Sequence, residues 1–350
     1  MHRLVYFLFC LLAAPLAQAL PGSPGPTISD EALHKQAIVV DTHADSTARI
    51  VHDGIDFAKE QPDMHLDLPK MQRGGVDAQF FSIFVSPWEA KPEQSYPAAL
   101  KQFEAVHAML QKNPKTIVWA KTAAEVRALA KRGVIAALFG VEGGHMLQPG
   151  TPPELIAHLG KFYELGARYM TLTWSIKSPL GGSSGDDSDG QGLTPVGREI
   201  VDEMQRLGMV VDISHVSDPL FWDVIRYVKR PVLASHSSAR ALANVPRNMT
   251  DAMLKAVARN GGAVCVNYNP GFLDAEYAKA EQAVTAAALL GGDVDSICAM
   301  SGALAGAVHG LSGIPVSWLK KLDHERPSVE EMMALCDEVN RVSPGGVTSV

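Results

Sequence analysis

The chain has little cysteine, only four residues in 350. One of them, Cys10, lies in an apolar N-terminal run, and the other three are widely spaced at Cys265, Cys298 and Cys336. This spacing excludes a disulfide framework and a Cys-x-x-Cys metal site. Because three is an odd number, at least one thiol of the exported chain is expected to be free.

An excess of basic charge is also lacking. The sequence has 31 Lys and Arg against 38 Asp and Glu, a formal net charge of -7, and it contains no nucleic-acid-binding motif. Both features argue against nucleic acid or an anionic membrane surface as the main partner. With 47% hydrophobic and 20% charged residues, the chain has the composition of a globular protein with a sizeable core.

A long hydrophobic run is missing as well. The apolar N-terminal run, residues 5–14, is too short to span a bilayer; it follows His2 and Arg3 and precedes the small residues Ala17 and Ala19. This pattern predicts a signal peptide over residues 1–19 and an exported protein, periplasmic or extracellular, with no transmembrane span after cleavage. Residues 20–30 are read as a linker.

Strand-like and helix-like segments alternate through most of the remaining chain. Because such alternation indicates βαβ units and a parallel sheet, the predicted fold class is α/β, a (β/α)₈ TIM-like barrel of the metal-dependent amidohydrolase type. The predicted strands are 37–42, 79–85, 134–141, 168–174, 209–214, 232–236 and 262–267. The predicted helices are 96–112, 123–131, 154–165, 194–207, 219–228 and 251–260.

The C-terminal part of the chain does not supply the eighth strand that a complete barrel needs. The barrel domain is assigned to residues 31–350, with an Ala-rich helical insertion at about 270–325 and a further helix beginning at Ser328. No apolar strand follows that helix. We therefore expect a barrel that is incomplete at its C-terminus.

Metal-ligand residue types recur where four of the predicted strands end. His43 and Asp45 follow the first strand, Glu142 follows the third, and His215 and His236 follow the fifth and sixth. The carboxyl ends of parallel strands meet at one face, where barrel enzymes carry their active sites. A single histidine after a strand has little meaning, but four such positions with one shared chemistry predict a metal centre.

The residue types favour two metal ions. His43 and Asp45 are two residues apart and project to one side of a strand, so both can face one ion. His215 and His236 can serve a second ion, and the two oxygens of Glu142 can bridge the pair. Nitrogen and carboxylate ligands suit zinc, and also manganese or cobalt. Two such ions would activate water for hydrolysis without a covalent nucleophile.

Several motifs together resemble the membrane (renal) dipeptidase family of zinc peptidases. They occur in order over roughly residues 30–335: Asp-Thr-His-Ala-Asp at 41–45, Gln-Phe-Phe-Ser at 79–82, Gly-Val-Glu-Gly-Gly-His at 140–145, Arg-Tyr-Met-Thr-Leu-Thr at 168–173, Asp-Ile-Ser-His at 212–215, Ser-His-Ser-Ser-Ala at 235–239 and Arg-Asn-Met at 247–249.

The resemblance implies hydrolysis of dipeptides by zinc-bound hydroxide at a binuclear site. His43 and Asp45 would bind one Zn²⁺ and His215 and His236 the other, while Glu142 would bridge them and act as a catalytic residue. Arg247 matches the family arginine that pairs with the substrate's carboxylate, a task that suits a planar guanidinium.

Two departures from the family pattern bear on activity. The family commonly has a histidine after Thr-Leu-Thr, where it contacts the substrate; here Trp174 stands, which donates one hydrogen bond and does not titrate. The family also places an aspartate in a Gly-Ser-Asp-Phe-Asp type segment on its eighth strand, and this sequence has no such segment. We therefore expect activity that is reduced or lost by truncation.

Alternative functions remain open at this stage. The chain could be a non-catalytic relative that binds metal or a dipeptide, or another binuclear amidohydrolase acting on a lactone, a phosphoester or a cyclic amide. Those other hydrolases usually begin with His-x-His, whereas this chain has His43 and Asp45. Apart from a small dipeptide, the partner predictions leave a homodimer open, and they do not specify the preferred dipeptide.

Overall fold

The computed structural model describes residues 29–88, 90–186 and 190–275. These residues fall into two compact units, one of residues 29–238 with 249–266 and one of residues 239–248 with 267–275. The predicted signal peptide, most of the predicted insertion and the region searched for an eighth barrel strand lie outside the described residues. Within the described part of the chain, none of the helices is long and apolar enough to cross a membrane.

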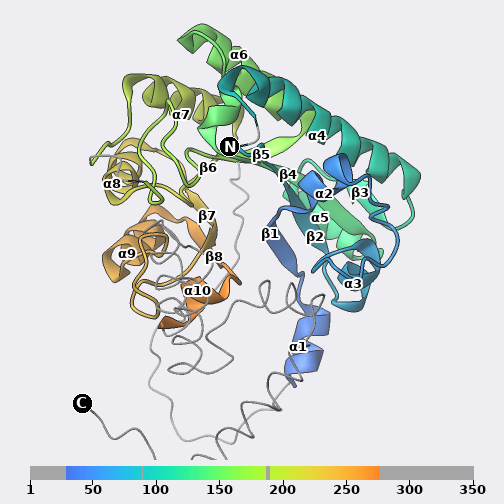
Figure 1. Cartoon of the computed structure of the whole chain (residues 1–350). Helices are drawn as coiled ribbons and strands as arrows, with labels where there is room; N and C mark the ends of the chain where they lie inside the picture. The colour runs from blue at the N-terminus through green and yellow to red at the C-terminus, as the bar shows by residue number, and fades with distance from the viewer. Residues whose placement is uncertain (1–28, 89, 187–189, 276–350) are drawn as a thin grey trace, which may run out of the picture. The chain divides into compact units, whose positions relative to one another are not determined.

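A parallel sheet forms the centre of the first unit (Figure 1). Its strand order is β1-β2-β4-β5-β6-β7-β8, with β3 paired to β4, and every pairing is parallel. The strands are β1 (Val40–Ala44), β2 (Ala78–Ile83), β3 (Ile117–Trp119), β4 (Ile135–Glu142), β5 (Ala167–Thr171), β6 (Val210–Asp212), β7 (Leu233–Ser237) and β8 (Ala263–Val266). All seven predicted strands are confirmed, and only the three-residue β3 was missed.

Helices connect the strands, as the βαβ pattern requires. The six predicted helices are confirmed as α4 (Pro92–Lys112), α5 (Ala123–Ala130), α6 (Pro152–Leu165), α7 (Pro195–Leu207), α8 (Asp218–Tyr227) and α9 (Asp251–Asn260). The sequence reading missed the shorter α1 (Asp30–Gln36), α2 (Ser46–His52), α3 (Leu68–Arg73), η1 (Gly144–Leu147) and α10 (Pro270–Leu273). These segments are too short to show a clear helical period.

The sheet curves until its first strand approaches its seventh. The hydroxyl of Thr42 in β1 donates a hydrogen bond of 2.6 Å to the carbonyl of Ser235 in β7, although four strands lie between β1 and β7 in the sheet order. This approach means that the sheet is nearly closed into a barrel, as the predicted fold class requires. It also brings the carboxyl ends of distant strands to one place.

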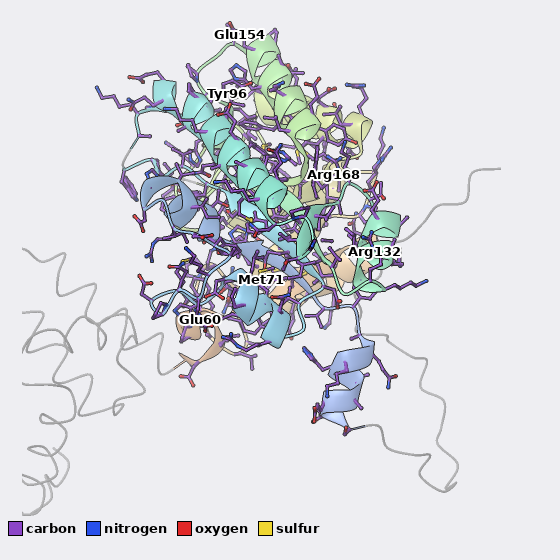
Figure 2. All side chains as sticks on the ribbon, turned by 90° about the vertical axis from the view of Figure 1, so that its right-hand side faces the viewer. Glu60, Met71, Tyr96, Arg132, Glu154 and Arg168 are labelled. Carbon is purple, nitrogen blue, oxygen red and sulfur yellow. The ribbon has the colours of Figure 1, made fainter. Side chains whose placement is uncertain are left out.

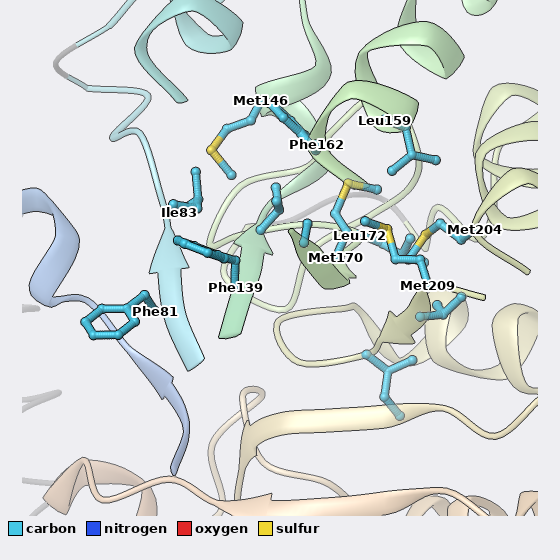
Figure 3. Close-up of a cluster of buried hydrophobic side chains, with 14 of the residues drawn as sticks. Phe81, Ile83, Phe139, Met146, Leu159, Phe162, Met170, Leu172, Met204 and Met209 are labelled. Atoms are coloured by element: carbon cyan, nitrogen blue, oxygen red, sulfur yellow. The ribbon is translucent and has the colours of Figure 1, made fainter. Parts of the chain in front are cut away.

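Alternate residues of β4 face opposite sides of the sheet. Phe139 and its odd-numbered neighbours join the larger apolar cluster, which Figure 3 shows together with side chains from β2 and from the helices. Ala136 and Leu138 face the other side and pack with residues of α5. Because side chains alternate along a strand, Gly140 and Glu142 are in phase with Ala136 and Leu138. Glu142 is therefore the polar end of a strand face that is otherwise small and apolar.

The helices α4 and α6 pack together over the sheet (Figure 2). The ring of Tyr96 in α4 stacks on His158 in α6 with 3.6 Å between centroids, and it also meets Phe162 at 5.3 Å. The Nδ1 atom of His158 is hydrogen-bonded to the carbonyl of Leu147 at 2.7 Å. This histidine therefore has a packing role.

Candidate metal centre

The four strand ends that carried the sequence prediction meet in the first unit. Glu142 is the last residue of β4, His43 lies in β1, His236 lies in β7, and His215 follows β6 by three residues. All four side chains are largely buried, and Glu142 is only 3% exposed as a residue. An ionised carboxylate at this depth requires positive partners.

The carboxylate of Glu142 contacts histidines with both of its oxygens. Oε1 lies 2.9 Å from His215 Nε2 and 3.3 Å from His236 Nε2. Oε2 lies 3.3 Å from His43 Nε2 and accepts a hydrogen bond of the same length from Ser82. The two oxygens thus divide the histidines into two groups, with the His215 and His236 Nε2 atoms 3.0 Å apart.

Asp45 joins His43 on the second oxygen's side of the site. Its Oδ1 lies 3.3 Å from His43 Nε2, and its side chain is 64% exposed. The spacing of two residues had predicted that both side chains face one point, and the structure places them so. One ligand pair is therefore half open to solvent, while Glu142 is buried.

The donor set fits a divalent cation. One ligand atom each from His43, Glu142 and His236 lies within 4.8 Å of the others, a separation that one ion can span. The buried His43 Nε2 makes no hydrogen bond of acceptable geometry to any residue that the structure describes, although two carboxylate oxygens stand 3.3 Å away. A nitrogen so placed is positioned to bind a cation together with the carboxylate oxygens, and imidazole with carboxylate suits zinc.

Proton affinities in the cluster reflect the same need for positive charge. Burial raises the pKa of Glu142, but the imidazoles of His43, His215 and His236 outweigh burial and hold that pKa well below its ordinary value. Burial lowers the pKa of His43, whereas Tyr169 and the carboxylates of Glu142 and Asp45 together raise it well above its ordinary value. Metal binding at such a cluster displaces protons from the imidazoles.

The backbone at His215 adopts an unusual conformation. Its φ angle is 66°, and it is the one residue other than glycine with positive φ in the described ranges. The hydroxyl and the backbone N–H of Ser184 both donate to the His215 carbonyl, at 3.1 and 2.8 Å. Such left-handed residues persist where surrounding contacts fix them, and they cluster at functional sites.

Gly143 lets His145 lie under the turn that follows β4. At Gly143 the φ angle is 108°, and a Cβ there would come within 2.4 Å of His145 Nδ1. The Nε2 atom of His145 is hydrogen-bonded to the Val85 carbonyl at 2.9 Å, and burial lowers the pKa of this histidine. His145 thus connects the turn after β4 to the segment that follows β2, beside the candidate metal ligands.

Trp174 stands beside the histidine cluster within an aromatic group. Its ring centroid lies 4.8 Å from that of Phe84, 6.3 Å from that of Trp88 and 6.4 Å from that of His215. Trp88 is 74% exposed. The side chain that replaces the family histidine is therefore next to a metal-ligand candidate and partly open to solvent.

Arg247 belongs to the second compact unit. Within that unit its guanidinium lies over the ring of Phe272, 5.6 Å from the ring centroid. The neighbouring Asn248 donates to the carbonyls of Ala243 and Phe272 at 2.8 and 2.9 Å. These contacts fix the turn that carries Arg247, whose role with substrate stays a prediction.

The sequence reading missed the residues that support the ligands. Tyr169, Asp212 and Ser235 are buried, and their hydroxyl and carboxylate groups contact the ligand histidines or one another. Asp212 could have been recognised from the sequence. A charged residue inside the apolar run before His215 is costly to bury, which indicates that it has hydrogen-bond partners there. Tyr169 gave no such indication, since an aromatic residue in a strand is ordinary.

The chain is similar to several solved metal-dependent hydrolases. A dipeptidase described as a metallo-peptidase of family M19 is 30% identical, with 68% of this chain and 74% of that chain covered and a TM-score of 0.63. A metallo-peptidase from Rhodobacter sphaeroides, solved with a phosphinate mimic of the dipeptide L-Ala-D-Ala, is 30% identical, with 68% and 76% covered and a TM-score of 0.60. An amidohydrolase from Pseudomonas aeruginosa is 25% identical, with 76% and 75% covered and a TM-score of 0.58.

A nearly closed parallel sheet with carboxylate and imidazole ligands at its strand ends defines a metal-dependent hydrolase of the barrel type. Residues 29–339 match the membrane dipeptidase family, peptidase family M19, and the chain belongs to that family. The resemblance drawn from the motifs is thereby confirmed. The family is one of dipeptidases, and both relatives at 30% identity are described as metallo-peptidases, which accords with the candidate triad His43, Glu142 and His236.

Proposed function

We propose that this protein is an exported zinc dipeptidase with two metal ions bridged by Glu142. The observation that carries the proposal is the division of the Glu142 carboxylate: one oxygen faces His215 and His236, the other faces His43. A carboxylate that held a single ion would not need imidazoles at both oxygens. The bridging arrangement accounts for both sets of contacts.

Each metal position would have its own pair of ligands from the chain. His43 and Asp45 would hold one Zn²⁺, and His215 and His236 the other, with Glu142 shared. Zinc accepts nitrogen and carboxylate oxygen in four-coordinate sites, and catalytic sites leave a position for water or substrate. The exposure of Asp45 supports an open position on the solvent side.

Two such cations, when bound, lower the pKa of water and polarise a carbonyl group. The chain's own contribution is to hold the ligands in register. Glu142 orients both ligand pairs, and the buried hydroxyl of Ser82 donates to its Oε2. Glu142 would therefore act in catalysis by holding both ligand pairs in place, in addition to binding metal.

The proposed substrate is a dipeptide. Support comes from the family and from the Rhodobacter sphaeroides relative, whose structure holds a mimic of L-Ala-D-Ala. Arg247 is proposed to bind the substrate's terminal carboxylate, on the strength of its Arg-Asn-Met motif. Export rests on the N-terminal signal pattern, and a homodimer stays a prediction.

Dipeptide turnover by the purified protein tests this proposal. We expect slow hydrolysis of L-Ala-D-Ala, in line with the reduced activity that the sequence predicts. It should disappear after chelator treatment and return when Zn²⁺ is added, with about two equivalents bound per chain at full recovery. Released alanine and metal content are measured on the same samples. Metal binding without any hydrolysis would favour the non-catalytic alternative, and folded protein that binds no metal would remove the proposed site.

Trp174 is proposed to contact the substrate and to limit turnover. The indole can donate one hydrogen bond but cannot titrate, whereas the family commonly has histidine at this position. A donor aimed at developing negative charge contributes about 10²–10³-fold to turnover in other hydrolytic enzymes. A Trp174→His variant should therefore raise kcat for a dipeptide, by at least about tenfold on this scale.

Steady-state kinetics with one dipeptide measures the effect of this change. Trp222→His in α8 is a matched control, because Trp222 packs against Phe221 on a helix and should leave kcat unchanged. An unchanged or lower kcat for Trp174→His, with zinc content preserved, would show that Trp174 is not what limits turnover.

A further inference from the structure

The proton on the His43 ring is assigned by hydrogen-bond partners. His43 Nδ1 lies 2.9 Å from the hydroxyl of Tyr169, and that hydroxyl donates at 2.9 Å to the carbonyl of Thr42. A phenol has one proton and a carbonyl can only accept. Because the proton of Tyr169 is committed to Thr42, its oxygen accepts from Nδ1–H. In the neutral ring, the Nε2 atom, which faces Glu142, then carries the lone pair that can bind a metal ion.

The same logic applies to His236 through a different residue. His236 Nδ1 lies 2.7 Å from the hydroxyl of Ser235, and that hydroxyl donates at 2.6 Å to Oδ2 of Asp212. A carboxylate is a stronger acceptor than a neutral imidazole, so the serine proton points at Asp212. Ser235 therefore accepts from His236 Nδ1–H, and the His236 Nε2 lone pair faces Glu142.

Asp212 is held so that it can only accept. Its Oδ1 takes the backbone N–H groups of Ser214 and Ser235 at 3.1 and 2.9 Å, and its Oδ2 takes the hydroxyls of Thr171 and Ser235 at 2.6 Å each. The side chain is fully buried in the first unit. The two backbone N–H donors on Oδ1 fix the orientation of the Asp212 carboxylate, so that Oδ2 faces the hydroxyls of Thr171 and Ser235.

We propose that Tyr169 and the Asp212–Ser235 pair are positioning residues that hold His43 and His236 in the Nδ1–H form, so that both Nε2 atoms are ready to bind a metal ion. This inference rests on the proposed function, since it concerns the same ligands. Partners of this kind fix the tautomer and ring orientation of ligating histidines, and their loss typically weakens metal binding about 10- to 100-fold.

Removal of each hydroxyl tests the proposal by metal affinity. Tyr169→Phe and Ser235→Ala should each weaken Zn²⁺ binding by about 10- to 100-fold in competition with a chromophoric chelator. Thr173→Val is the matched control, because the buried Thr173 hydroxyl makes no hydrogen bond to any residue that the structure describes. That control should bind Zn²⁺ as the wild type does.

Asp212→Asn provides a sharper test because it reverses the direction of the chain of hydrogen bonds. The two amide N–H donors require the asparagine oxygen at the Oδ1 position, which places its NH₂ group against the hydroxyls of Thr171 and Ser235. Of the acceptors that remain for the Ser235 hydroxyl, His236 Nδ1 at 2.7 Å is closer than Ser214 Oγ at 3.3 Å. We therefore expect Ser235 to donate to His236 Nδ1, which moves the ring proton to Nε2. Zn²⁺ affinity should fall, and the tautomer of His236 should change while that of His43 does not.

Nitrogen-15 NMR of the histidine rings measures which ring nitrogen carries the proton, and it does not depend on enzymatic activity. In the Zn²⁺-loaded wild type, His43 and His236 should each show a protonated Nδ1 and an unprotonated Nε2. Ligation through Nδ1 by either ring, or variants that bind Zn²⁺ as tightly as Thr173→Val, would overturn the inference and leave the metal site standing. A folded wild type that binds no Zn²⁺ would overturn the proposed function with it.

Discussion

The Glu142→Gln variant loses dipeptide hydrolysis by more than about 100-fold, the upper end of the loss expected when only a supporting partner of a ligand is removed. Glutamine keeps the shape of the side chain but replaces one oxygen with an NH₂ group, which cannot bind a cation. Whichever way the amide turns, either the His43 side or the side with His215 and His236 loses its ligand oxygen. Bound metal should therefore fall from two ions toward one or none.

Hydrolysis rate and metal content are measured together on folded protein, with circular dichroism to confirm folding. Glu164→Gln is the matched control, because its carboxylate is 71% exposed and pairs only loosely with Lys161, at 3.6 Å. A Glu142→Gln variant that keeps both ions and wild-type turnover would contradict the bridging role.

The Gly140→Ala substitution should destabilise the fold by about 1–3 kcal/mol, the usual cost of overpacking a core. A Cβ at Gly140 would come within 1.9 Å of the Cζ atom of Tyr169 and within 2.3 Å of its hydroxyl oxygen. The ring cannot move away freely, because its hydroxyl contacts both Thr42 and His43. The same clash should displace His43 and weaken Zn²⁺ binding.

Thermal unfolding of the metal-free protein measures this effect without the contribution of ligand binding. The control is Gly160→Ala in α6, where a Cβ would meet nothing within 4 Å, so that alanine should stabilise the helix by about 0.5–1 kcal/mol. In a Tyr169→Ala background, Gly140→Ala should cost less, because the clashing ring is gone. Equal melting temperatures for Gly140→Ala and Gly160→Ala would contradict the packing account.

The ligands at the strand ends could be predicted from the sequence because the geometry of a parallel sheet determines where the strand ends lie. Parallel strands bring their carboxyl ends to one face, so His43, Glu142, His215 and His236 had to lie near one another once their strands were recognised. The spacing of two residues predicted Asp45 beside His43, and its Oδ1 does lie 3.3 Å from His43 Nε2, although Asp45 follows β1 and stands at the start of α2 rather than in the strand. These inferences need only local patterns and a sheet topology.

The supporting residues could not be predicted, because they depend on details across the sheet. That Tyr169 in β5 reaches His43 in β1 follows from the curvature of the sheet and from the space that Gly140 leaves open. The positive φ angle of His215 depends on Ser184, which comes from a loop some thirty residues earlier in the chain. β3 could not be predicted because a strand of three residues is too short to show an alternation of apolar and polar residues.

The most direct measurement of the central claim is a crystal structure with anomalous scattering recorded at the zinc edge. We expect two peaks, one between Glu142 and the His43–Asp45 pair and one between Glu142 and the His215–His236 pair, each about 2.0–2.2 Å from its nearest carboxylate oxygen. A single peak that leaves either pair without metal, or peaks away from Glu142, would contradict a bridged binuclear site.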